Sequence, residues 1–331
     1  MATAPELVRA DGALLTQILD DTWPQWGDGL SRPAYEQWNA AQLRTPWGGR
    51  HLERVALVDG GTLRCSAKRY RITLRLDGRD LPAVGIGAVF TPAAQRGQGY
   101  ARQLIDRLCA DAGRDGCALA MLFSEIGPRY YERLGFRAVP HATCDITVAV
   151  RAGAPAMLVR SGDEHDAAHV AQMHVARLQG YRFGLVPDAD LVGYSVAKKR
   201  MLAGLDSSGR RSLEYFVTEE GYQAVAYVLL QVSRSQRAGQ PESWSLAACG
   251  DRDPAGARVG AMLQVLLARH PAERAPIIRA WWPAGFKPPQ LEIARRGLAA
   301  EVMMVRPLAG APRVEPWLAE GEAMFWHGDA F

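Results

Sequence analysis

The sequence lacks the features that mark several common classes of protein. No apolar run approaches the length of a membrane-spanning helix, and the N-terminus lacks the basic-then-apolar layout of a signal peptide. The 39 basic and 35 acidic residues leave a net charge of +4, without a block of lysine and arginine that would mark a nucleic-acid groove. We therefore expect a cytoplasmic protein that binds neither a membrane nor nucleic acid.

Cysteine and histidine show no metal-binding pattern. The five cysteines are scattered, with no Cys-x-x-Cys pair and no zinc spacing, and we assign them no chemistry. A helix predicted over residues 163–178 contains His165, His169 and His174. The first two are four residues apart, but no third ligand is evident, so we expect solvated histidines and no metal site.

Two common phosphate-binding motifs are also missing. After Gly97-Gln98-Gly99 the third glycine of a Rossmann fingerprint is replaced by Arg102, and no Gly-Lys-Ser/Thr ends a P-loop. What is present is the turn Pro-Ala-Ala-Gln-Arg-Gly-Gln-Gly-Tyr-Ala at residues 92–101, between an apolar strand at 81–91 and an amphipathic helix. Such a turn directs unpaired N–H groups and the positive end of the helix dipole at one spot, which predicts an anionic ligand.

The turn contains Arg96-x-x-Gly99-x-Ala101, which resembles the Arg/Gln-x-x-Gly-x-Gly/Ala signature of the GCN5-related N-acetyltransferase (GNAT) superfamily. Farther along, a buried strand at 117–123 precedes Tyr-Glu-Arg-Leu-Gly-Phe at 131–136, which is similar to the short helix of that family. The resemblance implies an α/β fold: a mixed, mainly antiparallel sheet flanked by helices.

The resemblance implies that the anionic ligand is acetyl-CoA. Main-chain groups of Ala88, Val89 and Phe90 would contact its pantetheine arm, and N–H groups freed by a bulge there could polarise the thioester carbonyl. The pyrophosphate would lie on the turn and the helix start. The residues assigned to it are Gln95, Arg96, Gly97, Gln98, Gly99, Tyr100, Ala101 and Arg102.

Tyr131 matches the tyrosine that protonates the departing thiolate in this family. A phenol with a pKa near ~10 can donate to a thiolate of comparable basicity. Tyr130 lies about 100° away around the helix and would point into packing. The alternative is that both tyrosines are wall residues.

A general base and an acceptor wall have weaker candidates. Glu125 follows the buried strand and could accept the amine proton, or it could only cap the short helix; His51 and His141 are weaker still. Trp23, Trp26 and Trp47 could wall an acceptor pocket, but Trp23 and Trp26 could equally plug the core. The sequence does not decide between these interpretations.

An antiparallel meander is predicted ahead of the motif strand, with strands at 55–58, 63–67 and 70–76. Lys68, Arg69 and Arg71 lie in this meander, and we expect them to face solvent. Contact with cofactor phosphates or with an acidic acceptor is the alternative.

The second half repeats the strand, turn, helix, strand order of the first, but its turn at 250–256 carries two carboxylates where a pyrophosphate would lie. We therefore predict one cofactor site and three parts. Residues 1–152 form the catalytic domain, 153–310 a degenerate GNAT-like domain, and 311–331 a tail directed at the active site.

The doubled arrangement resembles the enhanced-intracellular-survival type and the fungal lysine N6-acetyltransferases. In the survival type the terminal carboxylate serves as base, and a terminal Phe stands there as Phe331 does here. The alternative for this apolar tail is simple packing or contact within a homo-oligomer.

The sequence thus predicts an N-acetyltransferase that moves the acetyl group of acetyl-CoA to a primary amine of a small molecule or peptide, by direct attack on the thioester. A protein of another class, a non-catalytic acetyl-CoA sensor or partner-binding module, would carry the same phosphate turn and tyrosine helix.

Overall fold

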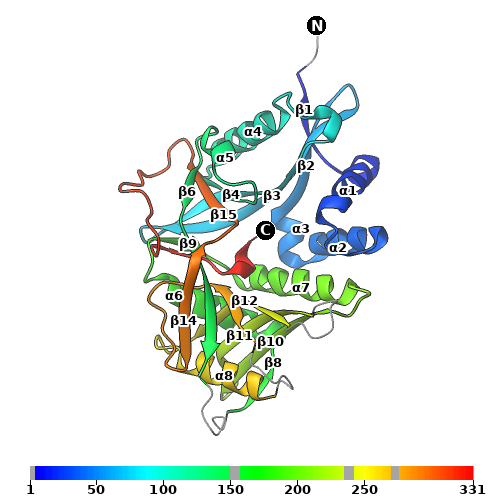
Figure 1. Ribbon diagram of the computed structural model, residues 1–331. Coiled ribbons are helices and arrows are strands. Elements are labelled where there is room, and N and C mark those ends of the chain that lie inside the picture. Colours follow the sequence, from blue (N-terminus) through cyan, green and yellow to red (C-terminus); the bar gives the residue numbers. More distant parts are fainter. Residues whose placement is uncertain (1–3, 150–156, 235–241, 270–275, 331) are drawn as a thin grey trace.

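Two β-sheets, each covered by helices, make up the structure (Figure 1). The computed structural model describes residues 4–149, 157–234, 242–269 and 276–330. Within these residues the strand pairs are mainly antiparallel, with parallel pairing between β4 and β5, between β12 and β13 and between β9 and β16. The mixed, mainly antiparallel α/β fold predicted from the sequence is confirmed.

The first sheet is built mostly by the N-terminal half. Helices α4 and α5 lie on one of its faces, and α1, α2 and α3 lie on the other (Figure 1). The strand order is β1 (Glu6–Arg9), β2 (Leu52–Asp59), β3 (Thr62–Leu76), β4 (Arg79–Phe90), β5 (Leu119–Ser124), β15 (Val302–Pro307) and β6 (Arg137–Val139). The helices are α1 (Gly12–Trp26), α2 (Arg32–Arg44), α3 (Pro46–His51), α4 (Tyr100–Arg114) and α5 (Arg129–Glu132).

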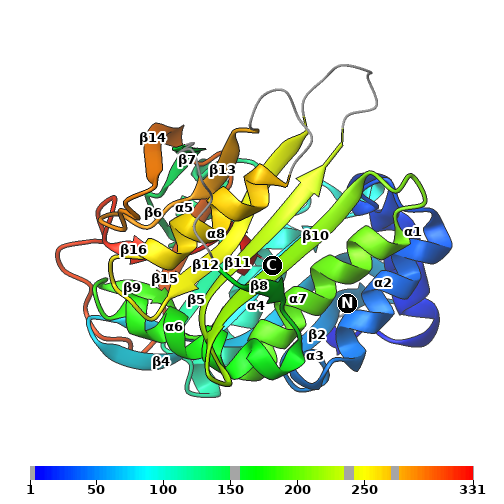
Figure 2. The ribbon, with the colours of Figure 1, turned by 90° about the horizontal axis from the view of Figure 1, so that it is seen from below.

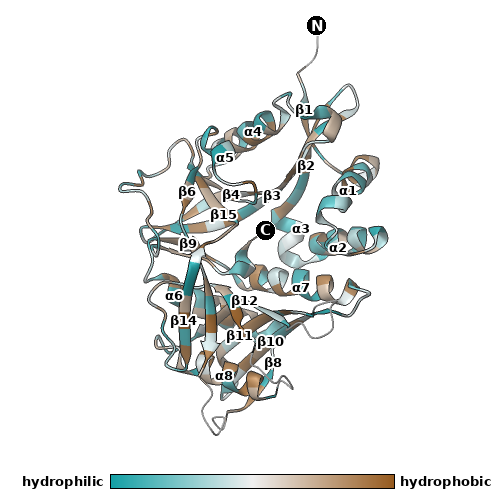
Figure 3. Ribbon diagram, viewed as in Figure 1, coloured by the Kyte–Doolittle hydropathy of each residue, from teal (hydrophilic) through white to brown (hydrophobic). Residues whose placement is uncertain are grey.

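The second sheet is built mostly by the C-terminal half, and α8 and α6 pack on it. Figure 3 shows hydrophobic residues along β11, β12 and α8, where this sheet meets its core. Its order is β14 (Leu291–Leu298), β7 (Ala142–Val148), β13 (Ile278–Trp281), β12 (Ser243–Asp251), β11 (Gln223–Ser233), β10 (Arg211–Glu220) and β8 (Val159–Ser161). The helices are α6 (Ala167–Leu178), α7 (Ala189–Leu205) and α8 (Ala257–Ala268).

The two halves exchange strands. β7 lies within residues 1–152, the predicted catalytic domain, but it pairs with β13 and β14 in the second sheet. In return β15 crosses back and pairs with both β5 and β6 in the first sheet. Antiparallel pairing needs only complementary strand edges, so a distant segment can complete either sheet. The division predicted at residue 152 therefore does not coincide with the division between the two sheets.

Helix α7 and the C-terminal tail lie between the halves. α7 contacts α2 and α3 on one side and β10 on the other, as Figure 2 shows. The tail strand β16 (Ala323–Met324) pairs with β9 (Phe183–Leu185), which itself pairs with β3. Beyond it Trp326 is fully buried, and the short turn η3 (His327–Asp329) follows. The apolar tail is therefore packed inside the protein.

Two local expectations were wrong. The meander has one continuous strand, β3, where two were expected. Lys68 was expected to face solvent, but it is 8% exposed because α2 covers that face of β3. Helix α7 was not predicted. No helix of the described residues is long and apolar enough to cross a membrane.

The strand exchange predicts that residues 1–152 do not fold alone. β15 contributes Met303, Met304 and Val305, each at most 1% exposed, and burying three such side chains stabilises by about 5 to 9 kcal/mol. That is comparable with the whole stability of a domain. We expect the 1–152 fragment to bind a hydrophobic dye and to show no cooperative thermal transition, and co-expression with residues 153–331 to restore one. A cooperative melt of the lone fragment would contradict the exchange.

Candidate active site

The glycine turn has the geometry of an anion cradle. After β4 the chain forms the short turn η1 (Ala93–Gln95) and enters α4 through Gly99, whose φ is +81°. Gly97 also has a positive φ, +79°, a region that glycine enters without strain. The first amides of α4 have no partner within the helix, so they and the helix dipole point at the turn. The turn and the helix start thus have the arrangement that the sequence predicted, and anion binding there stays a prediction.

Side chains of the turn are tied to their own loop. Arg96 Nε donates to Thr91 O at 3.1 Å, and Gln95 Oε1 accepts from Arg64 at 2.8 Å. Arg102 lies 3.5 Å from Asp106 on the exposed side of α4. The backbone is therefore the main donor set at the cradle, and the two arginines add positive charge near it.

The strand before the turn contains the expected bulge. The pairing of β4 with β3 passes from Gly87 opposite Lys68 to Phe90 opposite Ser66, so two residues of β4 face one of β3. Ala88, inside the bulge, has a φ of +48°. A residue with a Cβ is strained in this region, so the conformation costs free energy. The bulge turns main-chain groups of residues 88–89 out of the ladder.

β4 and β5 separate just before the bulge. They pair in parallel over three residues only, Ala83–Gly85 with Leu119–Met121. β4 then runs on to Phe90 and β5 to Ser124, each held on its outer side, by β3 and by β15. No strand of the described residues lies between the inner edges that face each other. This slot leads from the sheet to the cradle and can accept a polar, extended ligand.

Tyr131 on α5 is buried beside this region. It is 8% exposed, and its ring meets those of Tyr130 and Phe136 at centroid distances of 5.1 and 6.1 Å. Burial, followed by Tyr130, Cys65 and Glu125, raises the pKa of Tyr131 to about 12. The phenol therefore keeps its proton at neutral pH. Tyr130 is half-buried, with the Arg133 guanidinium 5.9 Å from its ring centroid.

A carboxylate pair lies beyond the end of β5. Glu125 is exposed in the turn that follows this strand, where Ser124 Oγ donates to Gly127 O at 2.7 Å. Glu301 precedes Val302, the residue opposite Ser124, and so lies across from Glu125. Burial and the charge of Glu125 raise the pKa of Glu301. The sequence did not identify Glu301 as a candidate site residue, because nothing in it places residue 301 beside β5.

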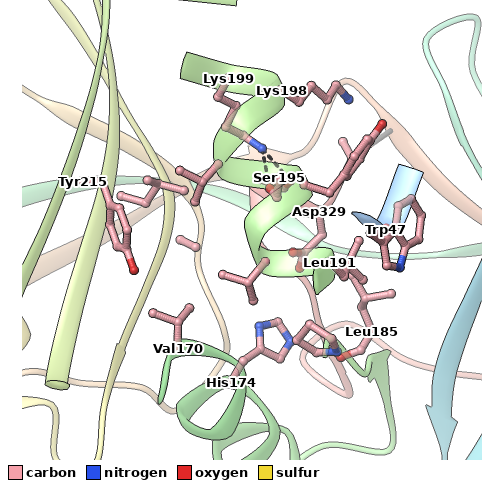
Figure 4. A pocket seen from close by; sticks show the side chains of 18 of the residues that line it. Trp47, Val170, His174, Leu185, Leu191, Ser195, Lys198, Lys199, Tyr215 and Asp329 are labelled. Atoms are coloured by element: carbon pink, nitrogen blue, oxygen red, sulfur yellow. Dashed lines mark hydrogen bonds between the residues drawn. The ribbon is translucent and has the colours of Figure 1, made fainter. Parts of the chain in front are cut away.

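A cavity of about 70 Å³ lies where the first sheet, α7 and the tail meet. Figure 4 shows Trp47, Ser195 and Lys199 around it. Lys199 Nζ donates to Ser195 Oγ at 2.8 Å and to Gly328 O at 2.9 Å, so this lysine ties α7 to the tail. Burial, followed by the neighbouring Lys198, lowers the pKa of Lys199 to about 7.

The three tryptophans expected at an acceptor wall lie in different places. Trp26 contacts Phe90 at the end of β4, with ring centroids 6.0 Å apart. Trp47 is 3% exposed and lines the central cavity against Tyr194. Trp23 is 37% exposed, and its indole donates to Leu30 O. The structure thus places Trp26 beside the bulged strand, Trp47 in the cavity and Trp23 at the surface.

The remaining candidates have structural partners. His51 stacks on Trp47 and His141 packs edge-on against Trp281, and burial lowers the pKa of both histidines. His174 is buried and not solvated as expected, with Nε2 3.1 Å from Leu185 O. No group of metal-ligating side chains occurs among the described residues.

The tail reaches the central cavity. Ala330 lines the cavity and packs against the core that contains Trp47. Phe331, the residue proposed to supply the terminal carboxylate, lies outside the described residues. Its role as base stays a prediction.

The second half has a matching turn, in which a side chain of the protein occupies the position of the anion. Gly256, with a φ of +72°, opens α8 as Gly99 opens α4. Here the side chain of Asp251 accepts from Arg258 N and from Asp253 N, each at 2.9 Å. An internal carboxylate thus occupies the helix N-terminus where an external anion would bind, as expected for a half without its own phosphate site.

Comparisons with known proteins agree with this geometry. Residues 25–139 match the family model described as "Acetyltransferase (GNAT) domain". A GCN5-related N-acetyltransferase from Kribbella flavida has the same fold, with 17% identity and a TM-score of 0.62, over 92% of this chain and 71% of that one. No curated protein sequence matches the chain significantly.

Two further solved structures extend the likeness over both halves. Eis1 from Mycobacterium abscessus is 14% identical with a TM-score of 0.54, over 85% of this chain and 72% of that one. Saccharomyces cerevisiae N-myristoyltransferase with bound myristoyl-CoA is 10% identical with a TM-score of 0.53, over 94% and 85%.

The matched residues belong to the GNAT class, and the solved structures show the same fold over most of the chain. Residues 25–139 carry a GNAT domain, which confirms the resemblance based on the glycine turn. The likeness to Eis1 along most of the chain agrees with the tandem arrangement expected from the sequence.

Proposed function

We propose that the protein is an N-acetyltransferase that transfers the acetyl group of acetyl-CoA to a primary amine of a small molecule or peptide. The observation that carries this proposal is the slot between β4 and β5, which contains the bulge and leads to the glycine turn at the start of α4. The GNAT match of residues 25–139 supports it.

The backbone would bind the cofactor in two places. Main-chain groups of residues 88–90 would pair with the amides of the pantetheine arm, since a slot between parted strands must satisfy its polar edges. The amides at the start of α4, with those of residues 95–99, would hold the pyrophosphate. Arg96 and Arg102 would add charge-assisted contacts.

The reaction follows from these positions. The amine nitrogen forms a bond to the thioester carbonyl carbon, the carbon–sulfur bond breaks, and the thiolate takes the proton of Tyr131. Main-chain N–H groups at the Ala88 bulge stabilise the charge that develops on the carbonyl oxygen. A carboxylate removes the proton of the attacking amine, and Glu125 and the terminal carboxylate of Phe331 are the candidates.

The cradle predicts a specific defect for Gly99→Ala. A Cβ at Gly99 meets nothing within 4 Å, so the change acts only through the positive φ, at about 1 to 3 kcal/mol. We expect the KM for acetyl-CoA to rise about tenfold. Gly61→Ala is the matched control, because Gly61 has a φ of +76° in equally open space but lies in the β2–β3 turn. The cradle assignment is wrong if both variants lose thermal stability alike and neither changes KM.

Tyr131→Phe tests the acid. General acids contribute about 10²- to 10⁴-fold, so we expect kcat to fall by that factor at every pH from 6 to 9. With a pKa raised to about 12, the wild-type phenol is protonated throughout this range and does not itself lower kcat at alkaline pH. Tyr130→Phe, in the neighbouring ring of the same helix, should keep kcat within about twofold. Equal activity of wild type and Tyr131→Phe would remove the acid role.

Two variants separate the candidate bases. A Gly-Gly extension after Phe331 moves the terminal carboxylate away, and Glu125→Gln removes the other carboxylate. We expect one of them to lose about 100-fold in kcat with acetyl-CoA affinity retained, because a base acts on the amine and not on cofactor binding. The loss should shrink as pH rises and the free amine increases. Full activity in both variants would exclude both candidates.

Release of CoA thiol with a panel of primary amines tests the function as a whole. Acetyl-CoA-dependent acetylation of at least one amine is expected. Tight acetyl-CoA binding without turnover of any amine would favour the sensor or partner-binding module instead.

A further inference from the structure

Two buried basic side chains, Arg54 and Lys68, lie side by side on the face of the first sheet that α2 covers, and burial lowers the pKa of both. In the antiparallel register Arg54 of β2 stands directly opposite Lys68 of β3. The two residues are 6% and 8% exposed. Side chains directly opposite have Cβ atoms about 4.5 to 5.5 Å apart, and like charges there are destabilising.

The groups that contact these cations are neutral. Arg54 Nη2 donates to Asn39 Oδ1 and Lys68 Nζ to Gln42 Oε1, each at 3.0 Å. Among the described residues neither cation is in an ion pair, and Arg54 Nη1 is buried without a hydrogen-bond partner. A buried charge without a counter-ion costs several kcal/mol, so this arrangement is incomplete as it stands.

The surroundings hold both cations in place. The amide nitrogens of Asn39 and Gln42 donate to carbonyls one turn earlier in α2, at 2.9 and 3.2 Å, which leaves the amide oxygens facing the cations. The Lys68 ammonium also lies 5.6 Å from the ring centroid of Trp38. The donors are therefore preorganised before any anion arrives.

A cavity of about 500 Å³ opens onto this pair between α1, α2 and β2. Arg54 and Lys68 line it together with Asn39, and Arg9 and Arg44 line it farther out. Two of its carboxylates are already paired with arginines, Glu36 with Arg32 and Glu53 with Arg69, while Asp11 is exposed. The buried end of the cavity is therefore cationic, and its volume suits a small organic molecule.

The cationic end adjoins the bulge. Lys68 stands opposite Gly87, the residue before Ala88, and paired Cα atoms in such a ladder are about 4.5 to 5.5 Å apart. A ligand held by Arg54 and Lys68 thus lies one strand away from the main-chain groups assigned to the thioester carbonyl.

We propose that this cavity binds the carboxylate of the acceptor, so that the amine substrate is one that carries a carboxylate, such as an amino acid. The assignment rests on the proposed acetyl transfer. Arg54 offers two donors to a carboxylate and Lys68 a third, and the bound anion supplies the counter-charge that the site lacks.

Binding is tested first without turnover. Thermal unfolding of the full chain in Tris chloride is followed with increasing glutarate, with its neutral analogue glutaramide and with inorganic phosphate. Glutarate should raise Tm progressively, and glutaramide should not. Equal effects of glutarate and glutaramide, or tighter binding of phosphate than of glutarate, would overturn the proposal.

Substitutions locate the effect. Lys68→Met and Arg54→Met should each weaken glutarate binding at least tenfold, and Lys68→Met should leave the Tm without ligand unchanged or higher, because it removes an unpaired buried charge. Lys199→Met is the matched control, a second buried lysine that lines the central cavity, and the glutarate shift should persist in it. Loss of the shift in Lys199→Met, or its persistence in both other variants, would place the anion elsewhere.

A kinetic comparison ties the site to the acceptor. Amino acids and their amides are offered with saturating acetyl-CoA, and the best acid should exceed its amide at least tenfold in kcat/KM, a ratio that falls toward one in Lys68→Met. Turnover with no preference for the acids would overturn this proposal alone. Glutarate binding without turnover of any amine would contradict the proposed acetyl transfer and leave an anion site.

Discussion

The parting of β4 and β5 after three residue pairs is the constraint on which the rest of the site depends. Two strands that separate inside a sheet expose main-chain groups, and each must be held firmly on its other side to remain apart. β3 holds β4, and β15 holds β5. The bulge at Ala88 then turns main-chain groups of β4 out of the ladder, and the left-handed Gly99 starts α4 at the far end. Slot, bulge and cradle are thus one continuous stretch of backbone, which explains why most contacts proposed for the cofactor come from the main chain.

The second half supports the first without repeating its chemistry. It has the same parallel strand pair with a helix between, and the same glycine in the left-handed region at the helix start. Asp251 fills the anion position there and binds Arg258, so the turn is closed by its own side chain. What this half contributes instead is β15, α7 and the tail. β15 completes the first sheet, and α7 and the tail line the central cavity. The first half therefore carries the glycine turn, and the second half completes the sheet of the first half.

The features that the sequence predicted are local ones. The glycine turn, the amphipathic α4 and the short helix that carries Tyr131 follow from patterns within some forty residues, and the structure has all three. The features missed depend on distant packing. α7 is covered from several sides by α2, α3 and β10, so its apolar residues form no single stripe. Residues 302–307 are an apolar run with no sign of which sheet they enter. Lys68 belongs to a strand with both faces covered, where alternation no longer separates buried from exposed positions.

The return of β15 to the first sheet also orders events during synthesis. β5 ends at Ser124, and the strand that covers its edge begins at Val302. At 5 to 20 residues per second, the ribosome needs roughly 10 to 35 s to make the intervening chain. Throughout that interval the nascent chain carries an open strand edge beside an apolar core, the kind of surface that chaperones recognise and that aggregates when unprotected. The slot between β4 and β5 can form only after residues 302–307 have been synthesised, so the first sheet is completed long after most of its strands exist.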